Sequence, residues 1–377
     1  MQCTYNMSKY LVKRGHDVTV YATDALRPRS DSRVPERIRV IEGAKVHFFP
    51  IVTGFCEMFI TPSLIPALRR HLGEFDVVHL HEVRSFQNIA FLLCRSKVGP
   101  YVVQTHGIKL PEHAFLEGKP HLVAARRAYQ VAFGRGLLKG ASKVVAYTNS
   151  ERKLLQTIGV DTSRIVTIPN AVSPEDYCDP SPMNPFEDEH VKVILYVGRV
   201  NRTKGIETLV KAFHLLAKHR TDVRLAIVGP DDGYLEELRE IVDSFGLADK
   251  VLFTGLVSHE RKVGAYYQAD VVVYPGMYEG FPIVPLEAAI MAKPLVVSTD
   301  PGMDFVREGK FGLTFPYGNE YQLENALETL LGDAHLAREL GERGKKCVLK
   351  NYTWDIVTDA VEQLYRDICE DSRGLQD

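Results

Sequence analysis

The apolar residues of the chain gather in short runs rich in valine and isoleucine, separated by longer segments in which apolar residues recur with a helical period. The short runs lack strict alternation of polar and apolar residues, which is typical of strands buried on both faces of a parallel sheet. The first segment is predicted to be a helix that ends at Gly15. The strands predicted in the first half are 16–22, 45–49, 77–80, 101–105, 143–147 and 165–168.

The second half of the chain restarts the same pattern after residue 190. The strands predicted there are 191–197, 224–228, 251–253, 271–274 and 295–298, and the predicted helices are 206–219 and 234–245. A last amphipathic helix is predicted from Trp354 to about Cys369, because its apolar residues form one stripe along the helix.

The segment 173–190 separates the two halves. It contains four prolines, which are Pro174, Pro180, Pro182 and Pro185. Proline cannot continue a helix or a central strand, so this segment is predicted to be a linker. Two series of strands and helices joined by a linker predict an α/β fold with two doubly wound, Rossmann-like domains that face each other across a cleft. The predicted domains are 1–172 and 191–352, and the predicted terminal helix is 353–377.

Composition narrows the class of protein. The chain of 377 residues is 45% hydrophobic, which suffices for two large cores, and its formal net charge of −2 gives no sign of a nucleic-acid partner. Its six cysteines are scattered without a Cys-x-x-Cys pair, as in reduced cytoplasmic proteins. No apolar run approaches the roughly 20 residues that span a bilayer, and the opening residues do not resemble a secretory signal. We therefore predict a cytoplasmic protein.

Glu279 and Glu287 bracket the stretch Gly-Phe-Pro-Ile-Val-Pro-Leu, which is the most informative part of the chain. The stretch joins a predicted strand to an apolar helix, at the kind of corner where open α/β sheets bind ligands. Ile283 and Val284 are expected in the first helical turn, where backbone N–H groups are free to bind an anion. Ionised carboxylates accept the hydrogen bonds that sugar hydroxyls donate. The corner therefore predicts a nucleotide-sugar site.

The stretch 198–205, Gly-Arg-Val-Asn-Arg-Thr-Lys-Gly, follows the first strand of the second half and opens a helix. Arg199 and Lys204 can reach an anion at the end of that strand, the first with a bidentate fork and the second with a mobile point charge. The alternative is a solvated basic loop, which the nearby glutamate corner disfavours. The glycine-rich motifs of NAD-dependent and P-loop proteins do not occur, and this argues against both chemistries.

Histidines mark the ends of two strands in the first half. His106, in Thr-His-Gly, can hydrogen-bond a sugar or act as a polar catalytic group, or it can simply be satisfied by backbone. His79 and His81 share one face of a strand and precede Glu82, which suggests a metal cluster. A third ligand is missing and no Asp-x-Asp pair occurs, whereas zinc needs three or four ligands, so no metal is predicted.

The stretch 119–143 combines cations with apolar residues and contains no acid. Its cations are Lys119, Arg126, Arg127, Arg135, Lys139 and Lys143. A basic amphipathic helix can lie on an anionic membrane surface, and it can equally be an ordinary helix with a solvated face. The first alternative points to a lipid-linked acceptor.

The motifs at 105–107, 198–205 and 279–287, together with Ile-Pro-Asn-Ala-Val at 168–172, resemble the retaining glycosyltransferases of family 4, which have the two-domain GT-B fold. The resemblance covers nearly the whole chain. The family begins with a strand and a glycine-rich loop ahead of the helix that starts here near Met1, so we expect these two elements to be missing.

The resemblance implies roles for the residues of the second half. Arg199 and Lys204 are expected to bind the donor diphosphate. The backbone N–H groups of Ile283 and Val284 are expected to bind its phosphate oxygens, and Glu279 the hydroxyls of the donor sugar.

The same resemblance assigns the nucleoside and the acceptor side. Glu287 is expected to bind the ribose hydroxyls, and Val257, His259 and Lys262 are expected to contact the base. His106 falls where the family has its acceptor-side histidine.

The function predicted from these observations is transfer of a sugar from a UDP- or GDP-linked donor to an acceptor hydroxyl, with retention at the anomeric carbon. The acceptor is expected to be lipid-linked or a polysaccharide, and neither a metal nor another cofactor is expected. His106 and Glu279 are the predicted catalytic residues. Two alternatives stay open: a nucleotide-sugar-binding protein with a degenerate transferase fold, and a nucleotide-sugar epimerase of the same fold. The enzyme is expected in the cytoplasm, bound peripherally to the cytoplasmic face of the membrane.

Overall fold

The structure, a computed structural model, describes residues 2–26, 32–55, 58–95, 99–108, 120–178, 191–277 and 279–373. The chain divides into two compact units. Unit 1 comprises Met1–Pro169 and Trp354–Asp377, and unit 2 comprises Asn170–Thr353. The division falls ahead of the predicted linker, most of which, 179–190, lies outside the described residues.

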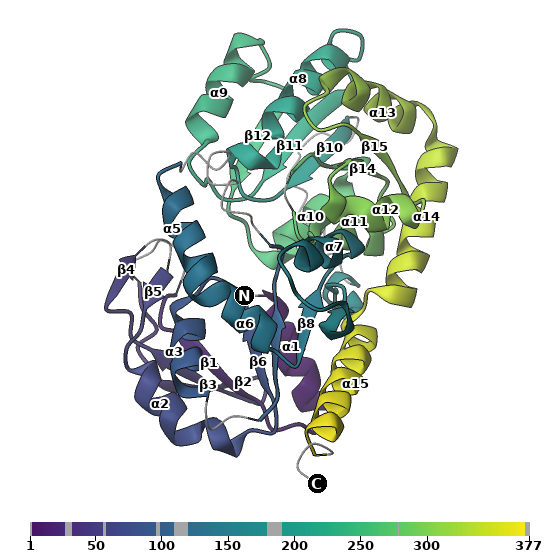
Figure 1. Ribbon diagram of the computed structural model, residues 1–377. Coiled ribbons are helices and arrows are strands. Elements are labelled where there is room, and N and C mark those ends of the chain that lie inside the picture. Colours follow the sequence, from purple (N-terminus) through teal and green to yellow (C-terminus); the bar gives the residue numbers. More distant parts are fainter. Residues whose placement is uncertain are drawn as a thin grey trace. The chain divides into compact units, whose positions relative to one another are not determined.

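The strands of unit 1 are β1 Thr19–Thr23, β2 Ile38–Ile41, β3 Ala44–Phe49, β4 Thr53–Phe55, β5 Met58–Ile60, β6 Val78–His81, β7 Tyr101–Gln104, β8 Lys143–Ala146 and β9 Ile165–Thr167. One sheet has the strand order β1-β3-β2, and a second has the order β6-β7-β8-β9 (Figure 1). The second sheet is entirely parallel, whereas β2 pairs antiparallel with β3. Strands β4 and β5 form a separate antiparallel hairpin.

The helices of unit 1 are α1 Gln2–Lys13, α2 Leu64–His71, η1 Leu72–Glu74, α3 Phe86–Cys94, α5 Leu122–Tyr129, η3 Gln130–Gly134, α6 Arg135–Gly140, α7 Asn149–Thr157, η4 Thr162–Arg164 and α15 Trp354–Arg373. One hydrophobic core joins α2, α3 and α6 to the parallel strands β7 and β8. Its centre is formed by side chains that are almost completely buried, such as Val103, Leu137 and Val144. This core fixes the ends of β6 and β7, which carry the predicted histidine site.

The split sheet of unit 1 differs from the prediction of one doubly wound sheet. In the part of the chain that the structure describes, no strand joins β1 to β6, and the side chains of both strands are only half-buried. The antiparallel strand β2 was absent from the prediction because it is largely exposed and carries little of the apolar pattern of a core strand.

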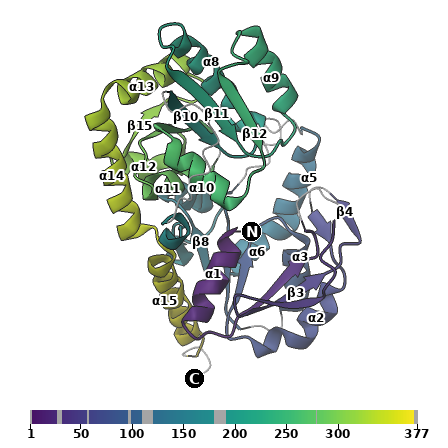
Figure 2. The same cartoon turned by 180° about the vertical axis from the view of Figure 1, so that it is seen from behind.

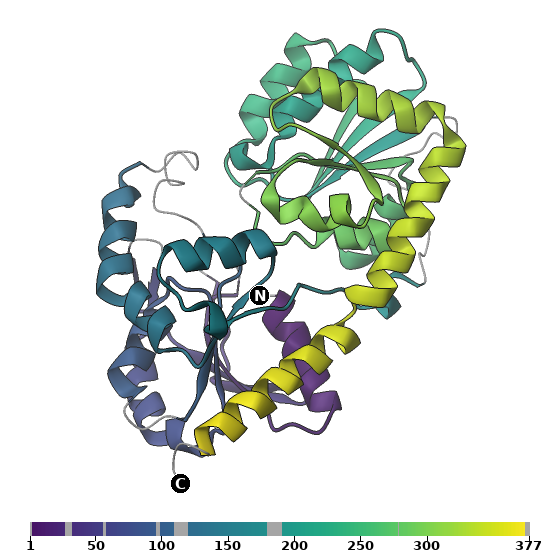
Figure 3. The ribbon, with the colours of Figure 1, turned by 45° about the vertical axis from the view of Figure 1, so that its right-hand side comes forward.

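The terminal helix α15 belongs to unit 1 and lies beside α1 (Figure 3). Trp354 is fully buried, and its ring lies 6.4 Å from that of Tyr10 on α1. Arg14, just after α1, donates hydrogen bonds to the carboxylates of Asp359 and Glu362. Because an apolar and an ionic contact both join the two helices, the last segment of the chain is an integral part of unit 1.

Unit 2 is built around a six-stranded parallel sheet. Its strands are β10 Lys192–Val197, β11 Val223–Val228, β12 Val251–Gly255, β13 Val271–Tyr274, β14 Leu295–Ser298 and β15 Gly312–Phe315. The strand order is β12-β11-β10-β13-β14-β15, so that β12 and β15 form the two edges (Figure 2). The order reverses direction between β10 and β13, which creates the switch point where doubly wound sheets bind ligands.

The helices of unit 2 are η5 Pro174–Tyr177, η6 Arg202–Lys204, α8 Ile206–Ala217, α9 Leu235–Ser244, α10 His259–Gln268, α11 Val284–Ile290, η7 Pro301–Met303, α12 Asp304–Glu308, α13 Glu320–Gly332 and α14 Ala334–Asn351. Helices α8, α9 and α13 share one hydrophobic core with the sheet. Helix α11 packs on β13 and β14 and against α14. The central strands are fully buried, which matches their uninterrupted apolar sequences.

Candidate functional site

The sharp connection after β10 brings the predicted basic loop to the end of β13. Gly205 has a φ of 65°, in the left-handed region that favours glycine, and it ends η6 just before α8 begins. A Cβ atom at this position would lie 2.1 Å from the carbonyl oxygen of Pro275, which follows β13. Only glycine therefore permits the approach that places Lys204 beside the glutamate corner.

Lys204 and Glu279 form an ion pair at this junction. The ammonium of Lys204 donates a hydrogen bond to Glu279 Oε1, and both side chains are largely buried. Tyr274, at the end of β13, accepts a second bond from Lys204 at 3.4 Å. Burial, and then the negative charge of Glu279, raise the pKa of the Tyr274 phenol, which therefore stays protonated. The pair combines a phosphate-binding cation with a hydroxyl-binding carboxylate.

A second layer of contacts holds the backbone of Glu279. Its amide donates to Asp300 Oδ1 at 3.3 Å, and Gly302 donates to the same oxygen at 2.9 Å. A Cβ atom at Gly302 would lie 2.3 Å from the carbonyl oxygen of Glu279. The loop after β14 therefore fixes the glutamate loop. The adjacent Tyr278 lies outside the described residues.

Arg199 lies on the same loop but is more exposed. Its guanidinium donates to Asp232 Oδ2 at 2.6 Å, and 58% of its side chain is accessible to solvent. The backbone oxygen of Arg199 accepts a hydrogen bond of 2.9 Å from the buried phenol of Tyr196. The backbone is thus anchored, while the guanidinium is largely exposed on one side and pairs with the mostly buried Asp232 on the other.

Glu287 is buried inside a cage of hydrogen-bond donors. The residue is 3% exposed. Its Oε1 accepts bonds of 2.7 Å from Tyr177 and from Lys262, and its Oε2 accepts one of 2.7 Å from Tyr266. An ionised carboxylate has about four acceptor positions, so these three donors leave one position for a ligand hydroxyl. Burial and then Glu287 raise the pKa of both phenols, which keeps them in the donor form.

The residues predicted to contact the base surround the start of α10. His259 is the first residue of this helix, and its Nε2 donates to the backbone oxygen of Asp176 at 2.9 Å. Its ring lies 5.7 Å from that of Tyr177. Val257 is half-buried just ahead of the helix, and Lys262 follows in its first turn. The short helix η5 is therefore in contact with the predicted base-binding residues.

The predicted phosphate-binding amides lie where the sequence indicates. Ile283 is the N-cap of α11 and Val284 is its first residue. Glu287 lies in the first turn of the same helix, and its amide donates to the carbonyl oxygen of Ile283 at 2.9 Å. The N-terminus of α11 thus lies on the same loop as Glu279.

Three cation–anion pairs therefore occupy the predicted donor site of unit 2: Arg199–Asp232, Lys204–Glu279 and Lys262–Glu287. Each pair neutralises a charge that would otherwise be desolvated near the strand ends. A phosphate or hydroxyl group that binds Lys204 or Glu279 competes with the internal partner of that residue, whereas Glu287 keeps one acceptor position for a ligand.

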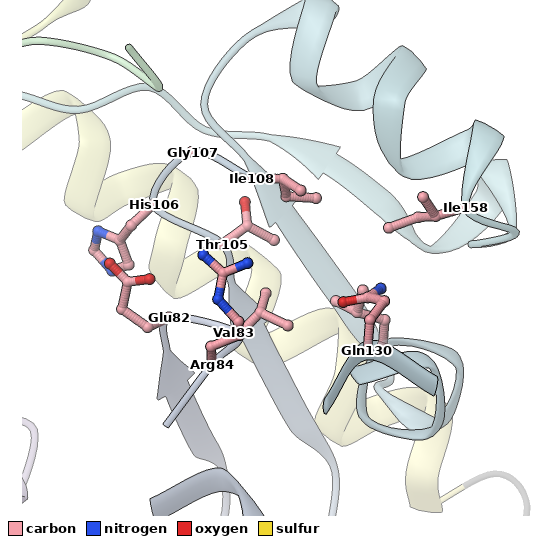
Figure 4. Close-up of a pocket in the computed structure, with 10 residues that line it drawn as sticks. Glu82, Val83, Arg84, Thr105, His106, Gly107, Ile108, Gln130 and Ile158 are labelled. Atoms are coloured by element: carbon pink, nitrogen blue, oxygen red, sulfur yellow. The ribbon is translucent and has the colours of Figure 1, made fainter. Parts of the chain in front are cut away.

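His106 lies in unit 1, at a pocket formed by the ends of β6 and β7 (Figure 4). The pocket is lined by Glu82, Val83, Arg84, Thr105, His106, Gly107, Ile108, Gln130, Leu138 and Ile158. Glu82 and His106 both line this pocket. His106 and Glu82 have φ values of 53° and 69°, in the left-handed region that non-glycine residues adopt at a cost of roughly 1–3 kcal/mol. Such backbone strain is typical of functional sites.

Both ring nitrogens of His106 have protein partners. Its Nδ1 lies 2.6 Å from the hydroxyl of Tyr147, and its Nε2 lies 2.8 Å from Nδ1 of His81. Burial lowers the pKa of His106 to about 4, so that the ring is neutral near pH 7. In this state His106 is a polar hydrogen-bonding group and a weak base, and a substrate can bind its ring nitrogens only by replacing one partner.

His79 and His81, on β6, form a chain of ring contacts with His106. Their rings are stacked with centroids 4.6 Å apart, and His79 Nδ1 lies 2.6 Å from the hydroxyl of Tyr365 on α15. Burial, and then repulsion from His106, lower the pKa of His79 to about 3. In the described part of the chain, no three His, Cys, Asp or Glu side chains are arranged to hold a metal ion.

The predicted basic segment forms α5, η3 and α6, with Lys119 outside the described residues and Lys143 at the start of β8. Several of its apolar side chains, including Val123 and Leu137, are buried in unit 1, whereas Val131 is exposed. Arg126 is also buried, at 4% exposure, so it cannot form part of a membrane-facing surface as the basic stretch suggested. Cations that remain exposed are Arg127, Arg135 and Lys139. Among the described residues, no helix is both long and apolar enough to cross a bilayer.

Comparison with known proteins identifies the class. The model of the family described as Glycosyltransferase Family 4 matches residues 2–176, and that of Glycosyl transferases group 1 matches residues 182–347. The two matches cover the two halves of the chain in the order in which the halves occur. The chain therefore belongs to the group 1 and family 4 glycosyltransferases, as its motifs predict.

Individual relatives agree with this assignment. Phosphatidyl-myo-inositol mannosyltransferase from Mycobacterium leprae is 26% identical, over 98% of this chain and 93% of that protein. Sucrose-phosphate synthase from Thermosynechococcus elongatus has a similar structure, with a TM-score of 0.79 at 21% identity, over 97% of this chain and 92% of that one. HepE from Anabaena, solved with UDP and glucose, has a TM-score of 0.74 at 19% identity, over 97% and 95%. These likenesses confirm the predicted GT-B fold.

Proposed function

We propose that the protein is a retaining, metal-independent glycosyltransferase that uses a nucleoside diphosphate sugar. The observation that carries this proposal is the Lys204–Glu279 pair, which lies at the end of β13 on the same loop as the N-terminus of α11. Phosphate favours cations and helix N-termini, and sugar hydroxyls favour a carboxylate acceptor. Unit 2 thus supplies a donor site that matches both parts of a nucleotide sugar.

Departure of the diphosphate develops negative charge, and the cationic residues stabilise that charge. Lys204 and Arg199 exchange their carboxylate partners for phosphate oxygens, and the amides of Ile283 and Val284 add the helix N-terminus. When Lys204 turns to the phosphate, it releases Glu279 to accept hydrogen bonds from the donor sugar. This exchange explains why the two charges can be paired in one state and bind different parts of the donor in the other.

The nucleoside is proposed to bind between the start of α10 and Glu287, with UDP or GDP as the leaving group. Glu287 has one open acceptor position for a ribose hydroxyl, and the ring of His259 lies beside Tyr177, which donates to Glu287. The UDP bound to HepE, a protein of the same fold, supports UDP as the first nucleotide to test.

The acceptor is proposed to bind in the His106 pocket of unit 1. A neutral imidazole, a carboxylate at Glu82 and an amide at Gln130 suit a polyhydroxylated acceptor. The relative that acts on phosphatidyl-myo-inositol supports a lipid-linked acceptor, and the exposed cations of α5 and α6 support a peripheral position on a cytoplasmic membrane face.

The test combines donor turnover with product stereochemistry. The protein is incubated with UDP- and GDP-sugars, with and without a mixture of glycan and lipid acceptors, in EDTA and in Mg²⁺ or Mn²⁺. We expect nucleotide release that requires an acceptor and a product with the anomeric configuration of the donor, by nuclear magnetic resonance. Isomerised donor without an acceptor would instead show an epimerase, and binding without any turnover would show a binding protein.

The matched control for the donor site lies on the same loop. Arg202 is two residues from Lys204, but it pairs with Glu237, at 2.9 Å for one of its two hydrogen bonds. Lys204→Met should abolish most turnover, whereas Arg202→Met should leave it nearly unchanged. Equal losses in both variants would contradict the assignment of the donor site.

A further inference from the structure

The corner between β8 and α7 contacts the His106 loop through two residues to which the predicted donor and acceptor sites give no role. We propose that Tyr147 and Glu151 are positioning residues for His106: Tyr147 fixes the orientation and tautomer of its ring, and Glu151 fixes its backbone. This inference rests on the proposed function in one respect, that the substrate contacts His106.

Glu151 holds the loop on either side of His106. It is 6% exposed, and in the described part of the chain no cation is paired with it. Its Oε1 accepts three hydrogen bonds from the loop after β7: one of 2.6 Å from the Thr105 hydroxyl and two of 3.0 Å from the amides of Gly107 and Ile108. Both neighbours of His106 in the sequence are therefore held by one carboxylate oxygen.

Helix capping alone does not explain this carboxylate. Thr148 is the N-cap of α7 and accepts a bond from the amide of Glu151, as in a capping box. In a capping box the glutamate reaches back to the N-cap amide, but Glu151 Oε2 instead accepts from the amide of Tyr147 at 2.7 Å. Its other oxygen, Oε1, accepts hydrogen bonds from outside the helix, in the loop that follows β7. Most of its hydrogen-bonding capacity thus serves the His106 loop.

The left-handed backbone of His106 shows why such support is needed. The conformation, with φ at 53°, is unfavourable for a residue with a Cβ atom, and it persists only if the surroundings impose it. Hydrogen bonds to a charged acceptor are among the stronger ones. The bonds from Thr105, Gly107 and Ile108 oppose the strain of the intervening residue.

Tyr147 contacts the ring of His106 rather than its backbone. Its buried phenol lies 3.4 Å from the thiol sulfur of Cys3, to which it can donate, and 2.6 Å from Nδ1 of His106. When the phenol proton points to Cys3, the phenol oxygen accepts from Nδ1–H of His106. The Nε2 atom of His106 is then the unprotonated nitrogen, and it accepts from Nδ1–H of His81. One tautomer of His106 follows from this chain of bonds, with Nε2 as the atom able to accept a substrate hydroxyl in place of His81.

The test measures directly which ring nitrogen of His106 carries the proton. The protein is labelled with ¹⁵N-histidine, and His106 is assigned by the loss of its signals in His106→Gln. Long-range ¹H–¹⁵N correlation distinguishes Nδ1–H from Nε2–H. We expect the Nδ1–H form in the wild type, a mixture of tautomers in Tyr147→Phe, and displaced His106 signals in Glu151→Gln. Where turnover is measurable, kcat should fall about tenfold in each variant, with little change in the KM of the donor.

Tyr101→Phe is the matched control. Tyr101 is also buried in unit 1, and its phenol donates to the carbonyl oxygen of Leu137 at 2.9 Å, away from His106. It should lower stability to a similar extent but leave the His106 signals and kcat unchanged. Unmoved His106 signals in a folded Tyr147→Phe or Glu151→Gln variant would overturn the role of that residue. The tautomer measurement needs no substrate, so it decides this inference even if the protein proves not to transfer sugar.

Discussion

The ammonium of Lys204 donates a hydrogen bond to the carboxylate of Glu279, so that two residues predicted to bind different parts of a donor are partners in this structure. Both side chains are largely buried, and the pairing leaves neither charge without a partner. It also links phosphate binding to sugar binding, because a phosphate that attracts Lys204 frees Glu279 for a sugar hydroxyl. A free nucleotide and an intact sugar donor should therefore test different members of the pair.

The first prediction concerns phosphate binding. Lys204→Met should weaken UDP and GDP binding on the order of tenfold or more, since a charge-assisted hydrogen bond is worth roughly 1.5–3 kcal/mol. Isothermal titration calorimetry measures both nucleotides, and uridine without phosphate is the control ligand. The affinity for uridine should stay unchanged. If uridine binding falls as much as UDP binding, Lys204 does not act on the phosphate.

A second experiment should distinguish the roles of Glu279 and Glu287. Glu287→Gln should lower the affinity for free nucleotide and lower stability, because three buried donors then share one acceptor oxygen. Glu279→Gln should leave nucleotide affinity nearly intact and mainly lower turnover with the sugar donor. Calorimetry and initial rates measure the two effects. Equal loss of nucleotide binding in both variants would refute this division of roles.

Chelation provides a third prediction. We expect EDTA to leave donor binding and turnover unchanged, because Lys204, Arg199 and the N-terminus of α11 supply the positive charge at the diphosphate. Parallel titrations with EDTA, Mg²⁺ and Mn²⁺ measure this. A loss of activity in EDTA that either ion restores would show that the mechanism depends on a metal.

A fourth prediction concerns stability at acidic pH. The pKa of His106 is about 4 in the folded state and about 6.5 when unperturbed, so the unfolded chain binds the proton first as the pH falls. Stability should be intact above pH 6.5 and be lost progressively down to pH 4, by on the order of 3 kcal/mol for this residue. Urea unfolding at pH 7 and pH 5 should show a smaller loss in His106→Gln than in the wild type.

His219 provides the control for that experiment. It is an exposed histidine that lies 3.4 Å from Glu324 in unit 2. His219→Gln should retain most of the wild-type pH dependence between pH 7 and pH 5. An equal change in the two variants would mean that burial of His106 in the neutral form does not determine the acid sensitivity.

The buried strands of unit 2 could be predicted closely from the sequence. Segments 271–274 and 295–298 match β13 and β14 residue for residue, because a short, uniformly apolar run fits only a strand covered on both faces. Strand β2 and the hairpin of β4 and β5 could not be predicted in the same way. Their residues are largely exposed, so burial imposes no clear pattern on them.

The candidate site was predictable only in part, for a related reason. Arg199, Lys204 and Glu279 lie in the connections that follow predicted strands, so their place near the strand ends can be read from local sequence. Their neighbours cannot, because Tyr177 approaches Glu287 across 110 positions and was predicted to lie in a linker on account of its prolines. The burial of Arg126 did leave a local signal. Helical spacing places it on the same face as Val123 and Tyr129, both of which are buried.

The last prediction concerns the membrane, and burial of Arg126 determines the choice of variant. Replacing that residue would disturb the core, so the exposed pair is changed instead, in Arg127→Glu/Arg135→Glu. Co-sedimentation with anionic liposomes should fall strongly in this variant, because each cation near such a surface is worth about 1 kcal/mol. Wild-type binding should also weaken as salt rises, since the screening length is only about 8 Å at physiological ionic strength.

Lys345→Glu/Lys346→Glu is the control variant. It makes the same change of charge on the exposed face of α14 and should bind like the wild type. If the wild type ignores anionic liposomes at low salt, α5 and α6 present an ordinary solvated face, and a soluble acceptor becomes the better proposal.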